Sequence, residues 1–150
     1  MKVYVCNECL TYYSTYEEAE GCCVWEQDDA PIVTTEEVDD RTYALMAFND
    51  DYDPSNYEEG YNVETIEYGK KEYLVVTDSE ADDLWEEDLD NYIEECVLCE
   101  LPERYQMYFD NEAFKRDCRY DGRAHSLARY DGNEYEERVN GTTYYIYRQN

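Results

Sequence analysis

The sequence predicts an α+β protein, in which one long acidic helix packs on a small sheet and a cysteine-rich module comes first. Three features predict it. Apolar residues recur at helical spacing from Asp78 to Cys99, hydrophobic runs flank a Gly69-Lys70 turn, and four cysteines gather in the first 23 residues. A length of 150 residues suits one domain with a small additional module.

The composition is strongly acidic and rich in tyrosine. The chain has 39 Asp plus Glu against 12 Lys plus Arg, which gives a formal net charge of -27, while 43% of its residues are hydrophobic and 19 are tyrosine. This hydrophobic content favours a folded core over disorder. Because like charges repel, the charge argues against binding to nucleic acid or to an anionic membrane and favours a basic protein partner.

Residues 1–26 form the predicted N-terminal module. A short strand over 3–5 leads into a Cys6-x2-Cys9 turn. Ser14 and Glu17 then match a capping box at the start of a helix. Two adjacent cysteines close that helix, so a turn and a helix end each present two thiols.

This arrangement is typical of a zinc-finger-like module, because a CxxC turn and a helix end together supply a closed tetrahedral site. A module this small also needs a disulfide or a bound metal ion to stay folded. We therefore expect a structural zinc ion bound by Cys6, Cys9, Cys22 and Cys23. Two adjacent cysteines rarely reach one ion without strain. Cys96, Cys99 or Cys118 therefore stays an alternative ligand in place of Cys22 or Cys23. The alternative is a set of partly buried thiols that bind no ion.

An acidic α+β domain is expected over residues 34–150, after a linker at 27–33. Thr34 and Glu37 match a second capping box ahead of a helix over 38–48, with a buried strand over 43–48 as the alternative. Further along, Asn140-Gly141-Thr142 is expected as a turn. The other expected elements are a loop over 49–60, hairpin strands over 61–68 and 72–76, a short helix over 103–117, and strands over 126–130 and 143–148 around an Asp131-Gly132 turn.

The long helix has the clearest signals. Thr77 is a good N-cap residue, and Glu80 completes a capping box. One face is predicted to be apolar and consists of Ala81, Leu84, Trp85, Leu89, Tyr92, Ile93, Cys96 and Val97. Carboxylates four residues apart on the other face lie ~6 Å apart along the axis, a spacing comparable to that of DNA phosphates. The predicted partner-binding residues are Asp82, Asp83, Glu86, Glu87, Asp90 and Glu94; the alternative is an ordinary solvated face.

The sequence favours a binding protein over an enzyme. His125 is its one histidine, and no nucleophile elbow or phosphate-binding loop is present. Asp51-x-Asp53-x-Ser55 lacks the glycine of a calcium loop, since Asn56 stands in its place. We expect no catalytic turnover. Replacing His125 by alanine should therefore leave the function of the protein unchanged.

The C-terminal third carries a resemblance to a known family. Leu101-Pro102-Glu103 and the run from Tyr108 to Asp117 resemble ArdA-type antirestriction proteins. The run from Gly122 to Glu134, with that from Tyr145 to Asn150, resembles endings common in phage and mobile-element proteins of that kind. That resemblance implies an elongated acidic mimic of DNA that occupies a restriction enzyme. Lys115 stands where that family usually has glycine, and the cysteine module is an addition to it. By class features, the chain also resembles acidic, zinc-containing anti-CRISPR proteins of phages.

We therefore expect a phage-encoded inhibitor of a bacterial defence nuclease, with a CRISPR effector placed ahead of a restriction enzyme. It would act in the cytoplasm of the host cell, where cysteines stay reduced and more often bind metal. The alternative from another class is a small zinc-containing adaptor or regulatory protein. Competition with DNA for the partner would distinguish an inhibitor from an adaptor.

Overall fold

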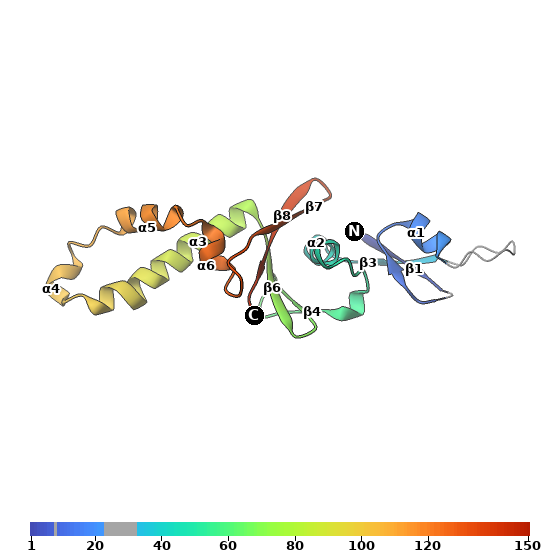
Figure 1. Ribbon diagram of the computed structural model, residues 1–150, viewed down its shortest axis with the longest axis horizontal. Helices are drawn as coiled ribbons and strands as arrows, with labels where there is room; N and C mark the ends of the chain where they lie inside the picture. The colour runs from blue at the N-terminus through green and yellow to red at the C-terminus, as the bar shows by residue number, and fades with distance from the viewer. Residues whose placement is uncertain (8, 23–32) are drawn as a thin grey trace, which may run out of the picture.

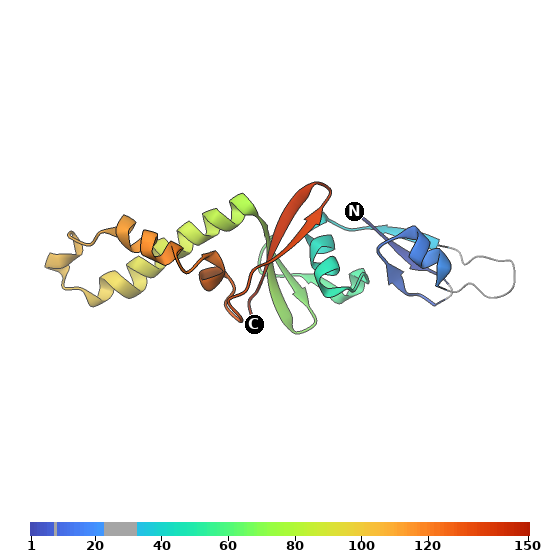
Figure 2. The same ribbon diagram turned by 45° about the horizontal axis from the view of Figure 1, so that its top comes forward.

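The computed structural model describes residues 1–7, 9–22 and 33–150. The molecule is elongated, with a three-stranded sheet at one end, a five-stranded sheet in the middle and a pair of long helical segments at the other end (Figure 1). A second view shows the same division (Figure 2). The predicted α+β class is confirmed, together with the long helix and the N-terminal cysteine cluster.

The N-terminal sheet is built around β1 (Lys2–Cys6), which pairs antiparallel with β2 (Tyr12–Tyr13) and with β3 (Val33–Glu37). The strand predicted over 3–5 is therefore confirmed. The capping box predicted at Thr34 is wrong, because Val33 and the two threonines that follow it are β-branched and pair with β1. Cys23 and most of the predicted linker lie outside the described residues.

Two helices begin at caps other than those predicted. The helix α1 (Tyr16–Gly21) is capped by Thr15 instead of Ser14, and the Thr15 hydroxyl accepts from the Glu18 amide at 3.3 Å. The helix α2 (Asp40–Asn49) is capped by Asp39, which accepts from the Thr42 amide at 2.8 Å. Both caps satisfy amides at a helix start that have no partner within the helix.

The central sheet has the order β4-β5-β6-β8-β7 and is antiparallel throughout. The Gly69-Lys70 turn joins β5 to β6 as predicted. Asn140 and Gly141 both have positive φ, as a type I′ turn requires, and they join β7 to β8. The strands are β4 (Tyr57–Glu59), after a 3-10 turn η1 (Pro54–Asn56), β5 (Thr65–Tyr68), β6 (Lys71–Thr77), β7 (Tyr135–Val139) and β8 (Thr142–Arg148).

Alternation along β6 and β8 gives this sheet two buried faces. Val75 and Ile146 belong to the core cluster under α2, whereas Val76 and Tyr147 belong to a second cluster with Ala81 of the long helix. Successive strand residues point to opposite faces. The two central strands are therefore covered on both sides, with α2 on one face and the start of the long helix on the other.

The helical end of the molecule consists of α3 (Asp78–Tyr92), which continues as a π-helical turn η2 (Ile93–Val97) and a 3-10 turn η3 (Leu98–Glu100). The capping box of Thr77 and Glu80 is present as predicted. The chain then turns at α4 (Glu103–Gln106) and runs back along α3 as α5 (Asn111–Arg119) and α6 (Arg123–Leu127) (Figures 1 and 2). Two helices thus replace the single one predicted over 103–117.

The strand predicted over 126–130 is wrong, because Leu127 and Ala128 end α6 and bury against Val76 and Tyr147. The strand that forms a hairpin with β8 is β7, and the turn between them is at Asn140-Gly141 instead of Asp131-Gly132. A segment without β-branched residues that buries two adjacent side chains suits a helix end better than a strand.

The apolar face of the long helix is only partly as predicted. Ala81, Leu89 and Ile93 are buried, but Tyr92 is 51% exposed and Cys96 is also exposed. Only the first turns of α3 pack on the sheet, and the π-helical turn then shifts the register of later side chains. The far half of the helix leaves the sheet and meets α5 and α6 instead, where the rings of Tyr92 and Phe114 stack with their centroids 6.0 Å apart.

Candidate partner-binding surface and metal site

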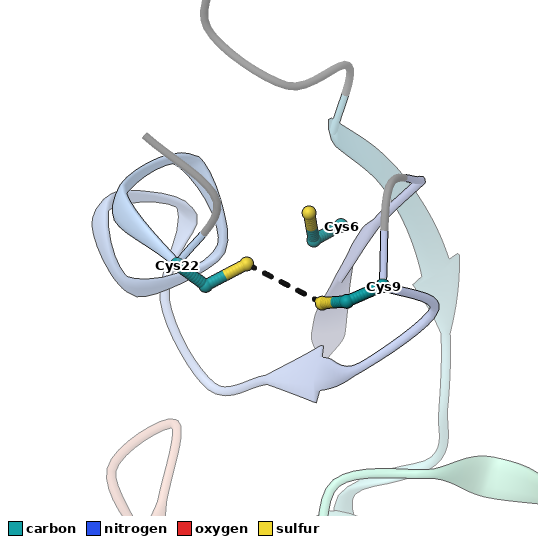
Figure 3. Close-up of side chains that lie close together, drawn as sticks. All are labelled: Cys6, Cys9 and Cys22. Carbon is teal, nitrogen blue, oxygen red and sulfur yellow. Dashed lines mark hydrogen bonds between the residues drawn. The ribbon is translucent and has the colours of Figure 1, made fainter. Parts of the chain in front are cut away.

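Three of the four predicted cysteine ligands come together. Cys6 ends β1, Cys9 lies in the turn before β2, and Cys22 follows the last residue of α1. Their sulfur atoms all lie within 4.8 Å of one another, and those of Cys9 and Cys22 are 3.5 Å apart (Figure 3). This cluster could hold a metal ion, since three thiols from a turn and a helix end point into one space.

The backbone around the cluster fits such a site. The Leu10 amide donates to the Cys6 carbonyl at 2.7 Å, and the Cys6 amide donates to the Thr11 carbonyl at 3.1 Å, which folds the CxxC turn back on itself. Leu10 has a φ of 59°, a left-handed conformation that costs a residue with a Cβ about 1–2 kcal/mol. A turn held in this conformation is over-determined by its surroundings, as at many ligand sites.

Tyr13 lies beside the cluster. Its hydrogen bond with Cys22 is the main cause that raises the pKa of Tyr13 to about 12, and burial adds to the shift. The Tyr13 hydroxyl is therefore protonated at neutral pH and can donate toward a sulfur that carries charge. Such outer contacts orient metal ligands.

The other cysteines left open as ligands lie elsewhere. Cys96 and Cys99 belong to the segment between α3 and α4, at the opposite end of the molecule from β1 and α1 (Figure 1). The Cys99 thiol donates to the Glu95 carbonyl at 2.7 Å. Cys118 lies in α5, and burial raises its pKa. None of the three can join the N-terminal cluster.

The six predicted partner-binding carboxylates divide into two rows along the helical segment that α3 begins. The inner row is Asp82, Glu86 and Asp90, and it faces α5 and α6. Glu86 accepts from Lys115 at 2.7 Å and from Arg119 at 3.0 Å, and Asp90 forms an ion pair with Lys115. Asp82 pairs with Arg123 at 2.9 Å. The inner row therefore holds the helical segments together.

The outer row consists of Asp83, Glu87 and Glu94, all of which are exposed. Among the described residues, no ion pair involves any of the three. Glu87 also borders a groove of about 520 Å³ beside the sheet, where Glu64, Glu72 and Asp88 join it opposite Arg129. Four carboxylates meet one cation in this groove, so this side of α3 keeps a net negative charge.

Lys115 is the buried cation of this region. It is only 5% exposed, and its hydrogen bonds with Asp90 and Glu86 raise its pKa. Arg41 plays a similar part at the other end of α3, where it binds both oxygens of Glu80 at 2.6 and 2.9 Å and donates to the Val75 carbonyl. These cations stabilise the position of the helix and neutralise part of its charge.

The internal partners of the inner row were missed in the sequence analysis, although the sequence contains a signal. Lys115, Arg119 and Arg123 are spaced four residues apart, like the acidic row that they meet. An antiparallel pair of helices brings two such rows into register. The spacing of these cations could therefore have predicted that the acidic face consists of two rows.

His125, considered above as a catalytic candidate, lines a cavity of about 330 Å³ between α3, α5 and α6 with Cys118 and Asp121. The raised pKa of Cys118 keeps its thiol protonated near neutral pH.

Among the helices of the described residues, none has the length and apolar character that crossing a membrane requires. No family model, curated protein or solved structure matches the chain.

Shifted carboxylate pKa values make the stability depend on pH. Burial raises the pKa of Asp88 and of Glu137, so each contributes stability that is present at low pH and lost as the pH rises through its folded-state pKa. The hydrogen bond from Lys115 lowers the pKa of Glu86, so its contribution disappears below the ordinary glutamate pKa of about 4.3. We expect the melting temperature to rise as the pH falls through the raised pKa values of Asp88 and Glu137, and to fall once the pH drops below the ordinary glutamate pKa of about 4.3. Thermal denaturation at successive pH values measures this, and a steady decrease from pH 7 would contradict it.

Proposed function

We propose that the chain inhibits a bacterial defence nuclease by occupying the basic surface on which that nuclease binds nucleic acid. The observation that carries the proposal is the division of the acidic helix. Its inner row binds the cations of α5 and α6, while its outer row stays exposed and unneutralised. Beside Glu87, carboxylates outnumber cations, since Glu64, Glu72 and Asp88 line the same groove with Arg129, so this side keeps a negative charge that a basic partner can neutralise.

The spacing and the total charge support this reading. Asp83 and Glu87 are four residues apart, and Glu94 lies seven further on, which gives steps of ~6 and ~10 Å along the axis. With a net charge of -27, the whole chain adds a negative field that speeds association with a basic groove. A protein that grips phosphates meets a comparable row of charges.

We infer that the N-terminal cluster binds zinc in a structural role. Thiolates suit zinc, and three sulfurs from a CxxC turn and a helix end leave one position for a fourth ligand. Elemental analysis of protein purified without added metal is expected to find one zinc per chain. Less than about a tenth of an equivalent of any transition metal would overturn the inference.

The target class that we favour is a CRISPR effector nuclease, ahead of a restriction enzyme, because the metal module departs from ArdA-type proteins. The setting would be the cytoplasm of a bacterium that carries a phage or mobile element. Inhibition by occupancy needs no turnover, so His125→Ala should inhibit as well as the natural sequence does.

The test uses a purified RNA-guided CRISPR effector and a purified restriction enzyme with their DNA substrates. The chain is expected to block DNA cleavage by one of them and to compete with labelled DNA for binding, less effectively as salt is added. Inhibition of the restriction enzyme alone would select the antirestriction alternative. Binding that DNA does not displace would favour an adaptor, and inhibition of neither enzyme would overturn the proposal.

A further inference from the structure

We propose that the turn around α4, at the far end of the helical hairpin, is a second contact: an apolar anchor that enters a pocket on the basic partner. This inference rests on the proposed function, because the partner is the same nuclease. The turn lies at the extreme end of the molecule, where it can enter a recess without moving the rest of the chain (Figure 1).

The turn exposes large side chains that a folded protein usually covers. Met107 is 79% exposed, Tyr108 is 77% exposed and Tyr105 is 48% exposed, within four consecutive residues. Single exposed hydrophobic residues are ordinary, but a group of them marks an interaction site. Tyrosine and methionine are also enriched at the centres of protein interfaces.

These side chains stand on a backbone that is already fixed. The Gln106 side-chain amide donates to the Leu98 carbonyl at 2.8 Å and to the Leu101 carbonyl at 3.2 Å, which ties the turn to the end of the long helix. Arg104 lies over the Tyr105 ring, 4.8 Å from its centroid. A preorganised turn loses less conformational entropy on binding, so the exposed groups can contribute more of their contact energy to affinity.

The charge around the turn identifies the occupant as a basic partner. The exposed cations there are Arg104 and Arg116, and exposed carboxylates outnumber them. A second copy of a chain with a net charge of -27 would be repelled at the short distances of an interface, within about one Debye length of 8 Å. The carboxylates that surround the turn are Glu95, Glu100, Glu103, Asp110 and Glu112.

The test measures the affinity of the nuclease inhibited above for two variants at several salt concentrations. Met107→Ser with Tyr108→Ala should weaken binding about thirtyfold or more and leave its salt dependence unchanged. Tyr120→Ala is the matched control, since Tyr120 is 84% exposed but stands alone at the end of α5. Circular dichroism and thermal melting of each variant check the fold.

The outcomes separate this inference from the proposed function. If the nuclease binds the natural chain and the double variant equally well, the anchor is wrong and the acidic surface stands. If affinity falls with a smaller salt dependence, the turn acts through charge and the apolar anchor is wrong. If sedimentation of the natural chain shows a dimer that the double variant loses, the occupant is a second copy and the inference is overturned. If neither nuclease binds the natural chain, both proposals fail.

Discussion

Replacing Cys6 by serine is expected to abolish the zinc binding that we propose and to unfold β1 and α1, while the central sheet stays folded. The module has few buried hydrophobic side chains of its own among the described residues, with Val5 and Ala19 beside Cys6, whereas Val3 packs in the core cluster of α2 and the central sheet. A core of this size cannot offset the conformational entropy of its own chain, so the proposed zinc ion would supply the missing free energy. Amide hydrogen exchange should accelerate about a hundredfold or more in β1.

Cys99→Ser is the matched control for that variant, because the Cys99 thiol is exposed and lies at the other end of the molecule. Its hydrogen exchange in β1 should equal that of the natural chain. A Cys6→Ser variant in which β1 keeps full protection would show that the three cysteines pack without binding a metal ion.

Charge reversal of the inner row is expected to destabilise the fold. Glu86→Lys with Asp90→Lys would place two cations beside Lys115, whose side chain is only 7% exposed. Losing the partners of a buried charge costs 3–5 kcal/mol, which we reduce to ~2 kcal/mol because the carboxylates are half exposed. The melting temperature should fall by about 5 °C or more.

The matched control reverses the outer row instead. Asp83→Lys with Glu87→Lys removes like-charge repulsion and touches no ion pair of the described residues, so the melting temperature should stay the same or rise. Equal melting temperatures for the two double variants would mean that the packing of α5 against α3 does not depend on the inner row.

Local signals predicted the elements that local physics decides. The Thr77 and Glu80 capping box places the start of α3, and the Gly69-Lys70 turn places the hairpin of β5 and β6. Prediction failed where a distant partner decides the structure. Val33–Glu37 becomes a strand because β1 is beside it, and Leu127 ends a helix because Val76 and Tyr147 bury it.

The candidate site was predictable to the same extent. The cysteine spacing predicted the cluster, because a CxxC turn and a helix end are local features. The acidic helix was also predicted, but its division into two rows depends on which segment packs against it. Lys115, Arg119 and Arg123 determine that division, and they bind carboxylates that lie 29 to 41 residues away along the chain. The periodicity of α3 alone does not predict these partners.

The measurement that tests the central claim most directly is the inhibition of DNA cleavage by a variant that carries Asp83→Lys, Glu87→Lys and Glu94→Lys. The variant should fold as well as the natural chain, because these side chains form no ion pair within the described part of the protein. Each lost contact with a cation of the nuclease is worth ~2 kcal/mol or more, so affinity should fall at least about a hundredfold at low salt. A folded variant that inhibits with the potency of the natural chain would contradict the account, because the outer row would then be only a solvated surface.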